Sequence, residues 1–282
     1  MKANKTPILI LVLFILLSGF GTNEPINELS PLEELIKSYQ DHKGYDRKEY
    51  PLGLFTRAYY KAEAKFAQLK LDELAKIDLS NLSETEKISA ELLKFVLQDK
   101  IDYYEYERFL NPLLSDSGFH SNLNYMVRPL SSYNRTKNYL NRLNAIPDFV
   151  DQHFVNLREG LEKGVAQPRV IFNGYESTYD DHIVSDYKDS YFYSPFLNLP
   201  NDLTPAQKDS VMIAAKTTIE SVVIPQFKRI KEFFETEYLP KTRTSLGISE
   251  TPGGKEFYQN RINYYTTSTQ YTAEDIHQIG LK

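Results

Sequence analysis

The spacing of apolar residues predicts helices along most of the chain. Apolar side chains recur every three or four positions, as they would on one face of an α-helix. The segments with this spacing are 53–77, 84–110, 132–143, 147–164 and 204–238. Pro225 lies inside the last of them, where a missing backbone hydrogen bond predicts a bend. We therefore expect a predominantly all-α fold, an irregular array of many helices without a fixed repeat.

Capping residues mark where several of these helices begin. Ser30 precedes Pro31 and two acidic residues, and Thr204 precedes Pro205. Ser83 stands three positions before Glu86, which is a complete capping box. Each pattern satisfies backbone N–H groups that the first helical turn leaves free, so each predicts a helix start.

Two stretches depart from the helical pattern. Residues 172–203 mix Gly, Pro, Asn and Asp with aromatic residues, which predicts broken helix and ordered loop. Residues 255–269 read as a helix that runs into an extended segment near 264–270, because Tyr and Thr there have high β-propensity. A last helix follows, capped by Thr272, with Asp275 in place of the usual Glu or Gln of a capping box. It stops about ten residues later, which indicates a chain that is incomplete at its C-terminus.

The N-terminus has the pattern of a signal peptide. Lysines precede an apolar run over residues 8–17, and small residues follow at Gly19 and Gly21. About ten apolar residues span half of a bilayer core, so a stable transmembrane helix is not expected. We predict a signal peptide over residues 1–21 and export to the periplasm or the medium. Membrane association through an uncleaved signal remains the alternative.

Composition excludes several classes of protein. The chain has 38 acidic against 33 basic residues and a net charge of −5, which argues against a nucleic-acid partner. It has no Cys, and hence neither disulfides nor a thiol nucleophile. Its 21 Tyr and 16 Phe fit ordinary helix packing, or alternatively grooves that bind polar ligands.

The chain offers no recognisable catalytic or metal motif. Its histidines are too far apart in sequence to share a helix face, and none stands in a His-Glu-x-x-His helix; they are His42, His120, His153, His182 and His277. Residues 180–182 could supply ligands or form a solvated turn, and His153 is better read as a packed or half-exposed helix residue. Serine elbows and phosphate-binding loops are also missing. We assign no catalytic residue and no metal ligand.

Several longer stretches resemble the bacterial domain-of-unknown-function 885 family. They are residues 77–93, 140–171, 194–200, 222–248 and 253–281. Members of that family are similar to exported, helical zinc metallopeptidases of roughly twice this length. Their zinc motif, His-Glu-x-x-Pro-Gly-His, belongs to a C-terminal half that does not occur here. The resemblance implies that residues 22–282 are the N-terminal helical part of such a domain, and that zinc is expected only in a full-length member.

The same resemblance suggests where a peptide substrate would bind. It puts His277 near the substrate channel, although a helix-start histidine bonded to the neighbouring loop is the plainer interpretation. Tyr264, Tyr265, Thr266 and Thr267 could form an extended edge that pairs with a peptide backbone, or a simple connector. The expected function is therefore the N-terminal portion of an exported zinc-metallopeptidase-like protein, inactive alone. The alternative is a non-catalytic extracytoplasmic helical module that binds a peptide or a partner.

Overall fold

The protein is described by a computed structural model in which residues 29–282 are placed; the predicted signal peptide, residues 1–21, lies outside them. The described part contains ten α-helices, short 3-10 and π segments, and no strand, which confirms the all-α prediction. The helices are α1 (Pro31–Asp41), α2 (Arg57–Leu74), α3 (Glu84–Glu105), α4 (Tyr133–Asn144), α5 (Ile146–Glu162), α6 (Ser177–Asp180), α7 (Pro205–Thr218), α8 (Ile224–Glu232), α9 (Gly254–Thr266) and α10 (Ala273–Gly280). No helix in residues 29–282 is long and apolar enough to cross a membrane.

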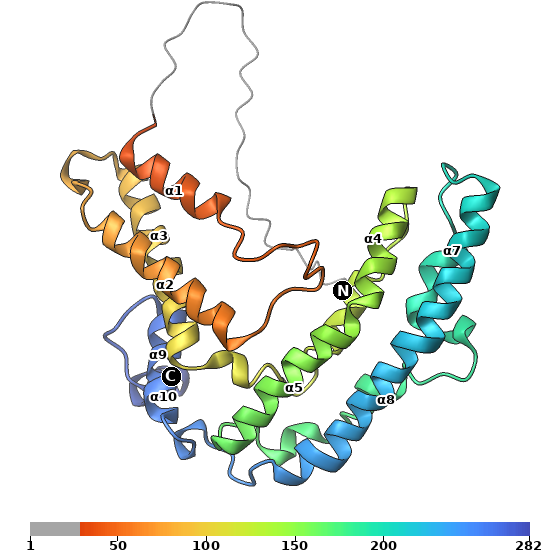
Figure 1. The fold of residues 1–282 in the computed structure, drawn as a ribbon. Helices are drawn as coiled ribbons and strands as arrows, with labels where there is room; N and C mark the ends of the chain where they lie inside the picture. Colours follow the sequence, from red (N-terminus) through yellow and green to blue (C-terminus); the bar gives the residue numbers. More distant parts are fainter. Residues whose placement is uncertain (1–28) are drawn as a thin grey trace, which may run out of the picture.

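The helices form two arms (Figure 1). In one arm, α2 and α3 pack side by side and α1 lies across them. In the other, α4 and α5 follow one line while α7 and α8 follow a second line beside it. Helices α9 and α10 return to the first arm and lie next to the end of α3, so both ends of the described chain belong to that arm.

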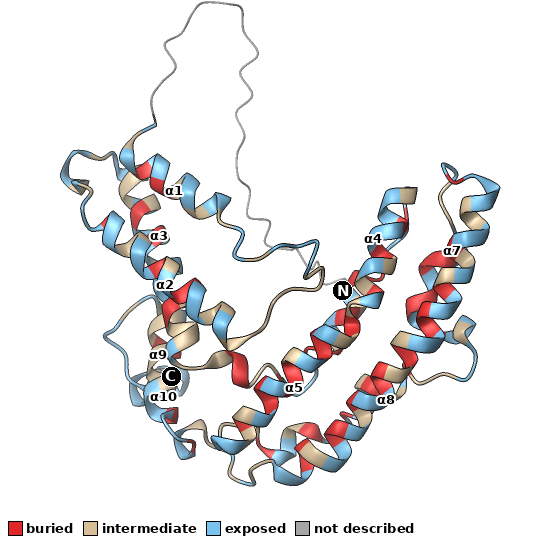
Figure 2. Ribbon diagram, viewed as in Figure 1, coloured by how far each residue is buried: buried red, intermediate tan, exposed pale blue. Residues whose placement is uncertain are grey.

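Each arm has its own hydrophobic core. The second arm and the irregular segment before α7 share a large cluster rich in Phe and Tyr, here called the aromatic core. The first arm holds a smaller cluster, here called the aliphatic core, made of Leu32, Leu35, Ala67, Leu74, Ala90, Leu93, Leu97 and Ile101. Figure 2 shows buried positions along the facing sides of α4–α5 and α7–α8, whereas α10 buries none.

The predicted helix starts are confirmed. Ser30, Ser83 and Thr204 each complete a capping box with the residue three positions later. Thr272 does so as well: the shorter Asp275 still reaches back and accepts a hydrogen bond from the Thr272 N–H at 2.8 Å. Asp275 therefore completes the box in place of the usual Glu or Gln, because a carboxylate one methylene shorter still spans the turn.

The long helix predicted over 204–238 has the expected extent but changes its winding. Two π segments, Ile219–Val223 and Phe233–Tyr238, flank α8. Pro225 is the second residue of α8, just after the first of them. Since proline has no N–H to donate, the wider turn before it accommodates the break in the hydrogen-bond ladder without ending the rod.

Several predicted boundaries were wrong, and the helix expected over 53–77 spans only Arg57–Leu74. The helix expected to reach residue 110 ends at Glu105, because Glu107 adopts a left-handed conformation with φ of 47°. The extended segment predicted near 264–270 is also absent at its start, since α9 continues through Thr266. Thr267, with φ of 52°, ends that helix and no strand follows it. Packing of Tyr264 on α3 outweighs the β-propensity of these residues.

Candidate functional site

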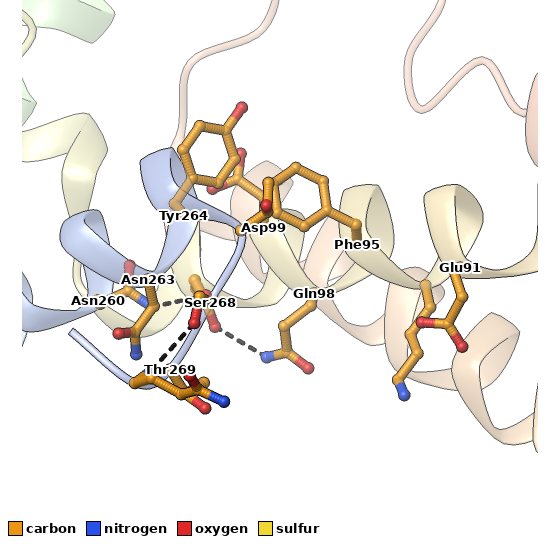
Figure 3. Close-up of a pocket in the computed structure, with 13 residues that line it drawn as sticks. Glu91, Phe95, Gln98, Asp99, Asn260, Asn263, Tyr264, Ser268 and Thr269 are labelled. Carbon is orange, nitrogen blue, oxygen red and sulfur yellow. Dashed lines mark hydrogen bonds between the residues drawn. The ribbon is translucent and has the colours of Figure 1, made fainter. Parts of the chain in front are cut away.

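A groove of about 640 Å³ lies between α3 and the end of α9 (Figure 3). We call it the α3–α9 groove. Its α3 wall includes Phe95, Gln98 and Asp102, and its other wall comes from α9 and residues 267–270. On α3 these side chains follow helical spacing, which brings positions three or four apart onto one face.

Polar contacts join the two walls at the base of the groove. The Asp99 carboxylate accepts hydrogen bonds from Arg261 at 3.1 Å and from Arg108 at 2.9 Å. Asp102 accepts one from the Asn260 amide at 2.7 Å. Arg261 is only 9% exposed, and its guanidinium lies 4.8 Å from the centre of the Tyr264 ring. These contacts hold α9 on α3 although the residues are about 160 positions apart in sequence.

A ring pair and a set of amides shape the interior. The rings of Phe95 and Tyr264 stack with centroids 5.0 Å apart, and Figure 3 shows them together at one side of the groove. The rest of the lining is mainly amides and hydroxyls, from Gln98, Asn260, Asn263, Thr267, Ser268, Thr269 and Gln270. Such groups both donate and accept hydrogen bonds, as a peptide backbone does. The groove therefore suits a peptide better than an apolar ligand.

The charges of the groove are mostly negative. Asp99 is matched by two arginines, whereas Asp102 contacts only the amides of Asn260 and Gln98. Glu91 and Lys94 complete the charged lining. No histidine lines the groove, and residues 29–282 contain no group of three or more His, Cys, Asp or Glu that could hold a metal ion. The lining side chains donate and accept hydrogen bonds, so the arrangement can bind a polar ligand.

The predicted site residues do not all come together. Tyr264 and Thr267 line the groove. Tyr265 is 78% exposed and is not part of the lining, and the Thr266 hydroxyl donates within its own helix to the Ile262 carbonyl at 2.8 Å. His277 is exposed on α10 and lies outside the lining.

The proposed mode of binding through an extended edge is wrong. Tyr264, Tyr265 and Thr266 are helical, so their backbone groups serve the helix and cannot pair with a peptide strand. What remains of the prediction is the location, because the C-terminal end of α9 does border a groove. Its α3 wall was missed altogether. Helical spacing could have placed Glu91, Gln98 and Asp102 on one face, but nothing in the sequence links that face to Asn260.

Three histidines that the sequence left scattered are buried in the aromatic core. His120, His153 and His182 are 0%, 5% and 6% exposed. Burial lowers the pKa of His120 and of His153 to about 3, and neighbouring histidines contribute for His120. Burial also lowers the pKa of His182. The packed interpretation of His153 is confirmed, and the solvated turn expected at 180–182 is wrong for His182, whose ring lies 4.3 Å from Phe227.

Comparisons with known proteins find a matching family and a solved structure of similar fold. A family model described as "Bacterial protein of unknown function (DUF885)" matches residues 39–282. A crystal structure described as that of a putative lipoprotein from Colwellia psychrerythraea is similar, with a TM-score of 0.73 at 18% sequence identity. The match covers 89% of this chain and 48% of that one, so this chain spans about half the length of its structural neighbour. No curated protein sequence matches.

Proposed function

The chain belongs to the DUF885 family of bacterial proteins of unknown function, and on that premise we propose that it forms the peptide-binding helical part of an exported zinc-metallopeptidase-like protein. The observation that carries the proposal is the amide-lined α3–α9 groove of about 640 Å³, a size in the usual range for ligand sites. Its mixed donors and acceptors match a peptide backbone. Its excess of carboxylates over lysine favours a peptide with a free amino terminus.

The described residues do not fit a catalytic zinc site. A peptidase zinc needs three protein ligands and a bound water, together with a carboxylate that takes the proton of that water. The three buried histidines lie among aromatic rings, and no acid joins them in a group able to hold a metal. We derive no hydrolytic step for this chain, and propose that in a longer member of the family it forms one wall of the substrate channel.

The test is peptide binding by a pair of matched variants. Gln98 and Gln68 each donate to an aspartate four positions later at 2.8 Å, but only Gln98 lines the groove. Gln98→Met should weaken binding of a labelled peptide by roughly fivefold to tenfold, the effect of about one hydrogen bond. Gln68→Met should leave binding unchanged. Equal peptide affinity of the parent chain and both variants would show that the groove is not the binding site.

The same preparation tests the proposed lack of catalysis. With added zinc, the chain should bind the peptide without cleaving it, as followed by mass spectrometry. Stoichiometric zinc together with hydrolysis would contradict the proposed role. Binding of the free amino-terminal peptide should also exceed binding of its acetylated form, because acetylation removes the positive charge that the carboxylates attract.

A non-catalytic extracytoplasmic binding module is the second candidate. The same groove supports it, since binding is the activity its residues can supply. The nucleotide sequence that follows codon 282 distinguishes the two candidates. A reading frame encoding His-Glu-x-x-Pro-Gly-His favours the first, and unrelated sequence favours the second. Export, which both share, predicts a mature N-terminus near residue 22 in protein recovered from the periplasm or the medium.

A further inference from the structure

A second cavity, of about 260 Å³, lies where the two arms meet. We call it the Arg142 cavity. It shares no lining residue with the α3–α9 groove. Its walls are mainly aromatic, with Tyr60 and Tyr103 from the first arm facing Phe119 and Phe149 from the second. The space is less than half the volume of the α3–α9 groove, so its occupant is a small molecule or the end of a longer chain.

Arg142 on α4 is the only formally charged residue in the lining, which contains no Asp or Glu. Within residues 29–282, no ion pair or hydrogen bond satisfies its guanidinium, and its Nε is buried without an acceptor. Burial lowers the pKa of Arg142, and no carboxylate offsets that effect. The buried Nε has lost water and gained no acceptor, which is unfavourable, and a bound carboxylate would supply that acceptor.

Other sheltered arginines of the described chain show how unusual this is. Arg57 donates to Glu107 at 2.7 Å, and both Arg108 and Arg261 donate to Asp99. Arg243 is satisfied by backbone carbonyl groups, including that of Ala166 at 2.9 Å. Arg142 alone among these lines a cavity with no acid in its wall and has a buried nitrogen without an acceptor.

Apart from Arg142, the polar residues of the lining are Tyr60, Tyr103, Asn122 and His153, and none of them carries a negative charge that would repel an anion at pH 7. His153 is 5% exposed and stacks on Phe119 with ring centroids 4.6 Å apart. Because burial lowers the pKa of His153 to about 3, its ring is neutral at pH 7. The cavity thus combines one positive charge with ring faces around a space of modest size.

We propose that the Arg142 cavity binds a small carboxylate, whose aromatic or aliphatic body fills the ring-lined space while its carboxylate accepts hydrogen bonds from the guanidinium. Planar guanidinium and carboxylate groups form paired hydrogen bonds that are stronger than neutral ones. The carboxylate could belong to a free acid or to the C-terminus of a peptide, since both present the same chemistry. The inference does not depend on the peptide groove.

Titration calorimetry on the whole chain tests whether binding depends on the charge of the ligand or only on its shape. 3-Phenylpropionate should bind, and its amide, which has the same shape without the charge, should bind at least about tenfold more weakly. N-acetyl-Gly-Phe and its C-terminal amide form the matching pair for a peptide terminus. Binding of one acid and not the other identifies the source of the carboxylate. Equal binding of acid and amide in both pairs, or no binding of either acid at about 10 mM, would overturn the proposal.

Substitutions then test the residue itself. Arg142→Gln should reduce binding of the preferred acid by about tenfold or more and leave binding of the amide unchanged, whereas Arg142→Lys should retain part of the acid affinity. Arg135→Gln, at an exposed position of the same helix, is the control and should bind like the parent. Unchanged acid affinity in Arg142→Gln would overturn the proposal. If that variant does not fold, the acid and amide comparison on the parent chain decides alone.

Discussion

The two arms of the molecule are built from similar helices, but their hydrophobic cores are buried to different degrees. The aromatic core buries its rings and three histidines almost completely, with Phe227 and Phe234 both 0% exposed. The aliphatic core is smaller, and beside it α3 leaves Ile88 and Leu92 about 60% exposed. Helix α9 reaches this arm through polar contacts with Asp99 and Asp102. The candidate groove therefore lies in the arm where packing is less complete, and the Arg142 cavity lies where the arms meet.

The largest expected effect concerns the aromatic core. Phe234→Ala should lower the free energy of unfolding by about 3–5 kcal/mol, because the ring is fully buried against Phe119, Tyr175 and Tyr179 and its removal leaves a cavity. Urea unfolding followed by circular dichroism measures it. Val155→Ala, at a position 62% exposed, is the control and should change stability by less than about 0.5 kcal/mol. A loss below about 1 kcal/mol for Phe234→Ala would mean that this core is loosely packed.

Acidification should destabilise the aromatic core at a higher pH than the first arm. His120 and His153 bind protons below pH 6.5 when unfolded but only near pH 3 when folded, so their contribution to stability is lost progressively as the pH falls from 6.5. At about pH 5 each lowers the free energy of unfolding by about 2 kcal/mol, since one pKa unit corresponds to 1.36 kcal/mol. His153→Phe, which keeps a ring against Phe119, should remove about half of this dependence.

The first arm should respond at lower pH. Burial alone would raise the pKa of Glu63, but hydrogen bonds from Lys100 and His42 outweigh it and the pKa is lowered below its usual 4.5. The stability that Glu63 contributes is thus present above pH 4.5 and lost only below it. Hydrogen exchange, corrected for its intrinsic pH dependence, should show α5 losing protection before α2. The reverse order would contradict the assignment of the acid-sensitive groups.

Breaking the contact between α3 and α9 should have an intermediate effect. Asp99→Asn leaves Arg108 and the 9%-exposed Arg261 without their carboxylate, which should lower stability by about 1–2 kcal/mol given the partial exposure of the aspartate. Helix α9 should exchange faster and peptide binding should weaken with it. Asp41→Asn, in an exposed pair with Lys37, is the control and should have almost no effect. Unchanged exchange in α9 would show that apolar packing holds it.

The smallest effects concern the helix caps. Ser83→Ala should lower the global free energy of unfolding by about 1 kcal/mol, because α3 carries part of the aliphatic core. Thr272→Ala removes an equivalent cap from α10, which buries no residue. It should therefore unwind α10 locally without changing the urea midpoint. Thermal and urea unfolding, with hydrogen exchange over residues 273–280, measure both; equal global losses would show that α10 belongs to the cooperative unit.

Local features of the fold could be predicted from the sequence, and long-range ones could not. The caps at Ser83 and Thr204 are read correctly because their partners lie three positions away. The groove depends on Asp99 meeting Arg261, 162 positions later, and no local pattern encodes that meeting. The histidines reach the aromatic core from separate elements, His153 from α5 and His120 and His182 from turns, and no local pattern encodes that either. At Tyr264 the local signal was misleading, because a stacking partner on α3 outweighed β-propensity.

The two π segments that flank α8 determine where this long helix can gain or lose residues among related proteins. Each holds one residue more than an α-turn, so a single deletion there would tighten the winding and leave the orientation of the helices on either side nearly unchanged. Removing the exposed Ser221 should keep Phe227 and Ile230 pointing inward, whereas a deletion inside α8 would swing them by about 100° toward solvent. Insertions and deletions in homologous chains are therefore expected to gather at these turns.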